Sequence, residues 1–160
     1  MKQTATIILL LILPLLARPQ SKVMRSLSAA HPGALVLMFY HSTLNMLNID
    51  DDPEFARMVR DIEKIKVLRI NKQENAFDRH ALASLKADLQ GHGFAELMII
   101  KSKGYDIGVY ILEDGDDIEG FFLMMDEEDS FTAIDVLGSM PVGDVSQLVN
   151  KIREVNDFKL

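Results

Sequence analysis

The chain has 160 residues, contains no cysteine, and carries 17 basic against 24 acidic side chains, for a formal net charge of −7. The lack of cysteine excludes disulfides and lipid attachment through an N-terminal Cys, so stability must come from packing. The acidic balance argues against nucleic acid and anionic lipid as partners.

The first 20 residues have the layout of an export signal. Lys2 follows the first Met, an apolar stretch runs from Ile7 to Leu13, and a short apolar remainder ends before Arg18. A cationic start followed by roughly 7 to 15 apolar residues is typical of a signal peptide, whereas a membrane-spanning helix needs about 20. We expect residues 1–20 to be a signal peptide, cut between residues 17 and 21, with an uncleaved anchor as the alternative. The product is then expected in the periplasm or cell envelope, or secreted.

Residues 21–160 are expected to form a single domain. Roughly 140 residues are enough to bury a core without metal or disulfide support. No second apolar stretch of spanning length follows the leader, so we expect no stable membrane span after its removal.

The N-terminal part of this domain alternates between helical and apolar extended patterns. Helical spacing of apolar residues predicts a short helix over Ser21–Ala30. A brief strand is expected over Ala34–Met38, followed by a helical turn or two that carries Leu44 and Leu47.

A helix start signal and a buried strand follow. Pro53 after three aspartates is typical of a first helical turn, and the apolar stripe beyond it predicts a helix from Asp50 to about Glu63. The apolar side chains of Lys64–Asn71 lie on both faces of an extended chain, which predicts a largely buried strand.

The rest of the chain reads as a helix, a strand meander and a closing helix. A helix is expected over Asn75–Gln90, because Gly91 and Gly93 stop it. Four β-type segments then follow, joined by short turns rich in Gly, Asp and Ser: Ala95–Lys101, Ile107–Glu113, Ile118–Met125 and Phe131–Leu137. Apolar residues from Val145 to Ile152 predict a closing helix. The expected fold class is α+β, a largely antiparallel sheet with a C-terminal four-strand meander and helices packed on it.

The meander carries a resemblance to a known family. Its features are a Glu-Leu-Met strand start at Glu96–Met98, a hairpin at Lys103 and Gly104, and a Gly-led entry to the last helix at Gly138. Over roughly residues 38–148 the chain resembles domain-of-unknown-function family 4252, a group of exported domains from Gram-negative bacteria. The resemblance implies export and a small α+β domain, and it brings no catalytic residue. Family members are often lipoproteins, from which this chain departs because it has no cysteine.

No group of residues predicts a catalytic, cofactor-binding or metal site. The four histidines, at 31, 41, 80 and 92, lack the close pair spacing of zinc sites. The acidic run from Glu113 to Glu119 has the wrong spacing for a calcium loop and is expected to be a solvated hairpin turn. We therefore assign no catalytic residue, no cofactor and no metal ligand.

One apolar feature leaves two interpretations open. The expected strand that contains Phe121 and Leu123 has apolar side chains at consecutive positions, and so does the neighbouring strand at Tyr110. Because consecutive side chains of a strand point to opposite faces, both faces of the sheet are apolar there. Either helices cover both faces, or one face stays open as a partner-binding face centred on Tyr110, Phe121 and Leu123.

These observations favour a non-enzymatic exported domain that works through protein contacts, for instance with another envelope protein. The alternative is a hydrolase or metal-dependent enzyme with an unrecognised site. The two classes differ in what the surface should show. An enzyme needs convergent polar groups in a concave pocket, whereas a binding domain can show only a flat apolar patch.

Overall fold

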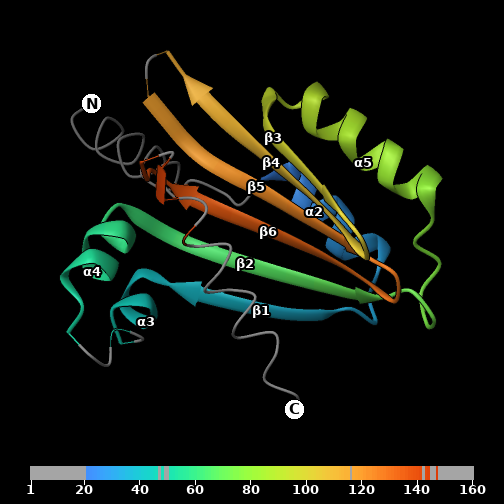
Figure 1. Cartoon of the computed structure of the whole chain (residues 1–160), viewed down its shortest axis with the longest axis horizontal. Coiled ribbons are helices and arrows are strands. Elements are labelled where there is room, and N and C mark those ends of the chain that lie inside the picture. The colour runs from blue at the N-terminus through green and yellow to red at the C-terminus, as the bar shows by residue number, and fades with distance from the viewer. Residues whose placement is uncertain are drawn as a thin grey trace, which may run out of the picture.

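The computed structural model describes residues 21–46, 48, 51–115, 117–141, 143, 144 and 147. The expected signal peptide and most of the expected closing helix lie outside these residues. The described part is an α+β fold in which helices flank both faces of one antiparallel sheet (Figure 1).

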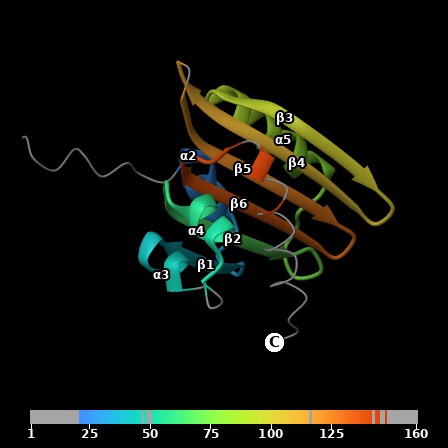
Figure 2. The same ribbon diagram turned by 60° about the vertical axis from the view of Figure 1, so that its left-hand side comes forward.

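Six strands form the sheet in the order β1-β2-β6-β5-β4-β3, and every neighbouring pair is antiparallel. The strands are β1 (Leu35–Tyr40), β2 (Ile62–Asn71), β3 (Phe94–Ser102), β4 (Tyr105–Asp114), β5 (Asp117–Glu127) and β6 (Ser130–Gly138). The predicted meander is confirmed as β3 to β6. Because β2 pairs with β6, strands β1 and β3 lie at opposite edges of the sheet (Figures 1 and 2).

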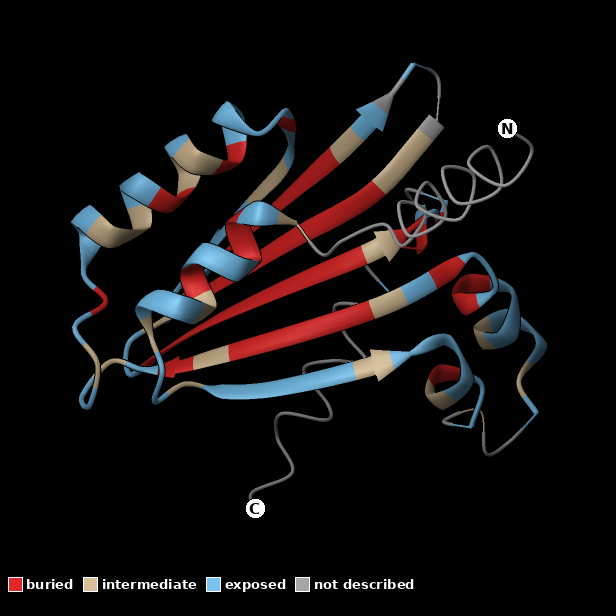
Figure 3. Ribbon diagram, turned by 180° about the vertical axis from the view of Figure 1, so that it is seen from behind, coloured by how far each residue is buried: buried red, intermediate tan, exposed pale blue. Residues whose placement is uncertain are grey.

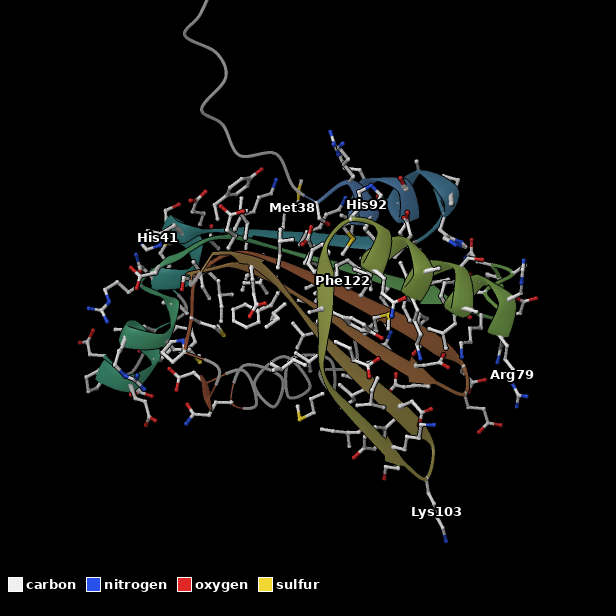
Figure 4. All side chains as sticks on the ribbon, turned by 90° about the horizontal axis from the view of Figure 1, so that it is seen from above. Met38, His41, Arg79, His92, Lys103 and Phe122 are labelled. Carbon is white, nitrogen blue, oxygen red and sulfur yellow. The ribbon has the colours of Figure 1, made fainter. Side chains whose placement is uncertain are left out.

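Four described helices flank this sheet: α2 (Lys22–Ala30), α3 (His41–Met46), α4 (Pro53–Val59) and α5 (Arg79–Gly91). Helices α2 and α5 lie on the far side of the sheet in Figure 1, which we call the back face. Helix α4 lies on the opposite, front face (Figure 4). The back-face helices are seen directly in Figure 3.

Side-chain caps explain where three of the helices begin. Ser21 accepts a hydrogen bond from the Met24 amide, and Asp52 accepts one from the Glu54 amide. Asp78 accepts from two amides of the first turn of α5. Each cap satisfies amides that have no partner within the helix.

Two predicted boundaries are wrong. The helix expected to reach Glu63 ends at Val59, and the next strand already begins at Ile62. Ile62 fits the apolar stripe of the helix, yet it is buried as a strand residue opposite Gly138 of β6. Pairing with a distant strand therefore overrode the local helical pattern. The helix expected from Asn75 begins only after its Asp78 cap.

The sheet separates two apolar cores. The front core consists of the buried side chains Leu44, Met58, Val59, Ile62, Ile65, Val67, Ile107, Val109, Ile111, Phe121, Leu123, Met125, Ile134, Val136 and Met140. The back core consists of Val23, Met24, Leu27, Leu68, Ile70, Phe77, Leu85, Leu89, Phe94, Tyr110, Phe122, Met124, Phe131 and Ala133. Burial on both faces explains why β5 is apolar at successive positions.

The chain after β6 returns to α4. Asp144 forms an ion pair with Arg57 at 3.3 Å, and the Gln147 amide group donates to the Glu54 carboxylate at 3.1 Å. Gly143, Asp144 and Gln147 are helical. These contacts place the start of the expected closing helix beside α4.

Candidate functional site

The three residues of the expected partner-binding face do not form one surface. Cross-strand neighbours share a face, and β4 pairs Tyr110 with Phe122 but Val109 with Leu123. Tyr110 therefore points into the back core, whereas Phe121 and Leu123 point into the front core. Each of the three is at most 2% exposed. Partner binding through them stays a prediction, and the exposed apolar side chains of the described chain lie elsewhere.

Tyr110 has a structural hydrogen bond at the edge of the back core. Its hydroxyl donates to the Glu96 carboxylate at 3.3 Å. Burial, together with the negative charge of Glu96, raises the pKa of Tyr110 to about 12. The phenol is therefore neutral at physiological pH.

Strand β1 carries most of the exposed large apolar side chains. Eight such residues occur in the described chain: Leu35, Val36, Leu37, Met38, Tyr40, Met46, Leu97 and Ile100. Five of the eight belong to β1, which has only six residues. Figure 3 shows β1 as a mostly exposed strand with no helix over it on the back face. Among the described residues, the backbone of this edge strand is paired on one side only, with β2.

The exposed side chains of β1 lie on both faces of the sheet. Val36 is opposite Leu68 of the back core, and Leu37 is opposite Val67 of the front core. Met38 lies on the side that carries α2 (Figure 4). The Lys64 ammonium lies 5.3 Å from the Tyr40 ring centre, within the range of a cation–π contact.

The two edges of the sheet differ in their protection against pairing. Natural edge strands carry charges, prolines or bulges that block another strand from adding. Strand β3 has Glu96 and Lys101, and its pairing register shifts between Glu96 and Met98. Strand β1 has no charged residue, no proline and an unbroken register from Leu35 to Tyr40. Its edge is therefore suited to accept a further strand.

The sequence of β1 contains a feature that is unusual for an edge strand. Residues 35–40 are six consecutive apolar side chains, LVLMFY. Sequence reasoning placed a strand at Ala34–Met38 but did not place it at an edge, because edge position depends on which distant strands pair. The exposed strand was missed for that reason.

A buried polar contact joins α2 to β6. The Ser21 amide and hydroxyl both donate to Asp135 Oδ2, at 3.1 and 2.8 Å. Burial raises the pKa of Asp135, while the Ser21 hydrogen bonds and the charges of Lys66 and Lys64 oppose this shift. Burial also lowers the pKa of Lys66, which lies opposite Asp135 on β2. This contact holds the start of the domain against the sheet.

Asp135→Asn is expected to change how stability depends on pH. Between the ordinary carboxyl pKa and the raised pKa of Asp135, the folded protein binds more protons than the unfolded chain, so the Asp135 contribution to stability falls as pH rises. Asparagine keeps an oxygen that accepts from Ser21 but does not titrate. Urea unfolding from pH 4 to 8 should therefore show the variant gaining stability relative to wild type as pH rises. Parallel profiles would contradict this account.

The comparisons with known proteins identify a family. The sequence model of the domain of unknown function DUF4252 matches residues 35–148. The chain belongs to this family. No curated protein and no solved structure matches it. The matched region of this DUF4252 domain begins at the first residue of β1 and contains all six strands, whereas α2 precedes it.

Histidines of the DUF4252 domain make local structural contacts. His41 Nδ1 donates to the Ile62 carbonyl at 3.0 Å, and its Nε2 accepts from the Asn45 amide group at 3.1 Å. His92 Nδ1 donates to the Asp88 carbonyl at 2.9 Å at the exposed end of α5. Within the described ranges, no three His, Asp or Glu side chains are grouped as metal ligands. No helix among the described residues is long and apolar enough to span a bilayer.

Proposed function

We propose that this DUF4252 chain is an exported, non-enzymatic domain that binds protein by adding a strand to the edge of β1. The observation that carries the proposal is the exposed, uncharged and regular β1 edge of an otherwise protected sheet. In strand addition, main-chain hydrogen bonds supply affinity, and side chains on alternate faces supply specificity.

Export is supported by the N-terminal sequence. Its cationic start and short apolar stretch are typical of a signal peptide. Cleavage between residues 17 and 21 leaves Ser21 in the product, and with it the contact to Asp135. The proposed location is the periplasm or cell envelope, or the medium after secretion, where another envelope protein is an available partner.

The β1 edge defines the chemistry of the partner strand. Val36, Met38 and Tyr40 lie on the back face, and Leu35 and Leu37 lie on the front face. A strand that pairs with β1 therefore meets apolar neighbours on both of its faces. It needs apolar side chains at successive positions, because a charge placed there would lose hydration and no residue of β1 carries a charge that could pair with it.

Site-specific photo-crosslinking tests strand addition at β1. A photoreactive amino acid replaces Met38 in the full chain, and Ile100 is the matched control position on the other edge; the two side chains are 49% and 39% exposed. After irradiation in an exporting host, we expect protein adducts at position 38 and few at position 100. Leu37→Lys in the same chain should remove the adducts. Equal adduct yields at both positions, or adducts unaffected by Leu37→Lys, would contradict binding through β1.

A further inference from the structure

We propose that the strand that occupies the β1 edge belongs to a second copy of this chain, so that two sheets join across β1 into one continuous sheet. This inference rests on the proposed binding function of β1 and names its partner.

The side chains of β1 satisfy the requirement that β1 imposes on its partner. The partner strand must be apolar on both faces, and LVLMFY is apolar at six successive positions. In the folded protein this strand is already ordered by its pairing with β2. A second copy therefore does not lose the backbone entropy that a flexible peptide loses when it is ordered on binding.

Two-fold symmetry brings like faces together. An axis perpendicular to the sheet makes the two β1 strands antiparallel, and each face of one sheet continues into the same face of the other. Centred on Leu37, this pairing places Val36 opposite Met38 of the other copy, both on the back face. No residue of β1 is charged, so no like charges are brought opposite each other.

The nearest cations do not oppose this arrangement strongly. Lys64, Lys66 and Arg69 lie on β2, one strand away from the edge. The Lys64 ammonium reaches over Tyr40 of β1, but the axis passes through Leu37, so the two Tyr40 residues of the dimer lie about 20 Å apart along the strands. The two β2 strands of the dimer are separated by three strand spacings, about 14 Å. This separation exceeds the Debye length of about 8 Å at physiological salt, so exposed charges on the two strands are largely screened.

The opposite edge limits the assembly to two copies. A sheet with two open edges would add further copies and form a fibril. The register shift and the charges of Glu96 and Lys101 protect β3. Only β1 is then available, and a symmetric β1 contact uses up this edge in both copies.

The size of the contact sets the expected affinity. A stable interface buries about 800 Å² on each partner, whereas this contact joins the two sheets along a single six-residue strand. We therefore expect a reversible dimer with a dissociation constant on the order of 1 to 100 μM.

Sedimentation equilibrium over a micromolar to millimolar concentration series tests the dimer. The full chain is expressed with its N-terminal segment and purified from an exporting host. Leu37→Lys in β1 and Leu97→Lys in β3 form a matched pair, because both leucines lie on edge strands and both are 37% exposed. Wild type and Leu97→Lys are expected to shift from one to two copies as concentration rises. Leu37→Lys should weaken dimerisation at least tenfold with unchanged circular dichroism.

Single-cysteine cross-linking tests the geometry directly. Because the chain has no cysteine, Val36→Cys and Ile100→Cys each introduce one thiol at a side chain that is 39% exposed. A short bifunctional thiol reagent should join two copies through position 36 and leave position 100 monomeric.

The outcomes separate this inference from the proposed function. A monomer at all concentrations, together with β1 adducts to a different protein in the photo-crosslinking experiment, overturns the second copy and supports binding at β1. A dimer that persists in Leu37→Lys overturns β1 as its interface. A monomer without adducts at position 38 overturns both.

Discussion

Gly138→Ala is expected to lower the free energy of unfolding by at least about 3 kcal/mol. A Cβ atom at Gly138 would lie 2.2 Å from the Asp61 carbonyl oxygen and 2.9 Å from the Ile62 Cα, and both of these are backbone atoms. The residue also has a φ of +118°, which an L side chain rarely adopts. Relief of the clash would separate β6 from the start of β2. Urea unfolding followed by circular dichroism measures the loss.

Gly104→Ala is the matched control for this substitution. Gly104 has a φ of +95°, and a Cβ there meets no atom within 4 Å. It therefore isolates the cost of the backbone conformation from the cost of the clash. We expect Gly104→Ala to be clearly less destabilising. Equal losses in the two variants would show that the close approach of Gly138 to the backbone of Asp61 and Ile62 adds nothing to the cost of Gly138→Ala.

Phe122→Ala is expected to cost about 3 to 5 kcal/mol of stability. Phe122 is fully buried in the back core, opposite Tyr110 on β4. Its ring centre lies 6.0 Å from that of Phe94, with the ring planes at 74°, so the substitution also removes an edge-to-face contact. The cavity would lie between the sheet and the back-face helices. Thermal and urea unfolding of the variant measure the effect.

Leu97→Ala provides the comparison for an exposed apolar residue. Leu97 lies on β3 with 37% of its surface exposed, and substitutions at such positions change stability by about 0.5 kcal/mol. A Phe122→Ala loss as small as that of Leu97→Ala would contradict the two-core description. The same measurement on Leu37→Lys shows whether its effect on association is separate from folding.

The C-terminal meander was predictable because its signals are local. A Gly or an Asp marks each turn between β3 and β6, and sequential strands joined by short turns pair with each other. The helix over Ser21–Ala30 followed in the same way from the spacing of its apolar residues. These features depend on a few neighbouring residues, which is why the sequence alone predicted them.

The predicted partner-binding residues illustrate the opposite case. Because side chains alternate between the two faces along β5, its run of apolar residues correctly implied that both faces are apolar. The same pattern did not show which residues of β4 share a face with which residues of β5. The register places Phe122 beside Tyr110, and Phe121 with Leu123 on the other side. Grouping residues from two strands requires the register, and that depends on the contacts of both strands.

The sequence by itself determined the α+β class, the meander and the apolar character of residues 35–40, because hydrophobic period and turn residues act over short distances. Only the tertiary structure decided that β2 pairs with β6, whose paired residues lie 59 to 76 positions further along the chain, and that this pairing joins β1 and β2 to the meander. That pairing leaves β1 at an edge, where five of the six apolar residues of a strand that resembles a core strand remain exposed. Whether an apolar strand lies in the core or at the surface depends on which distant strands pair beside it, and no local sequence pattern carries that information.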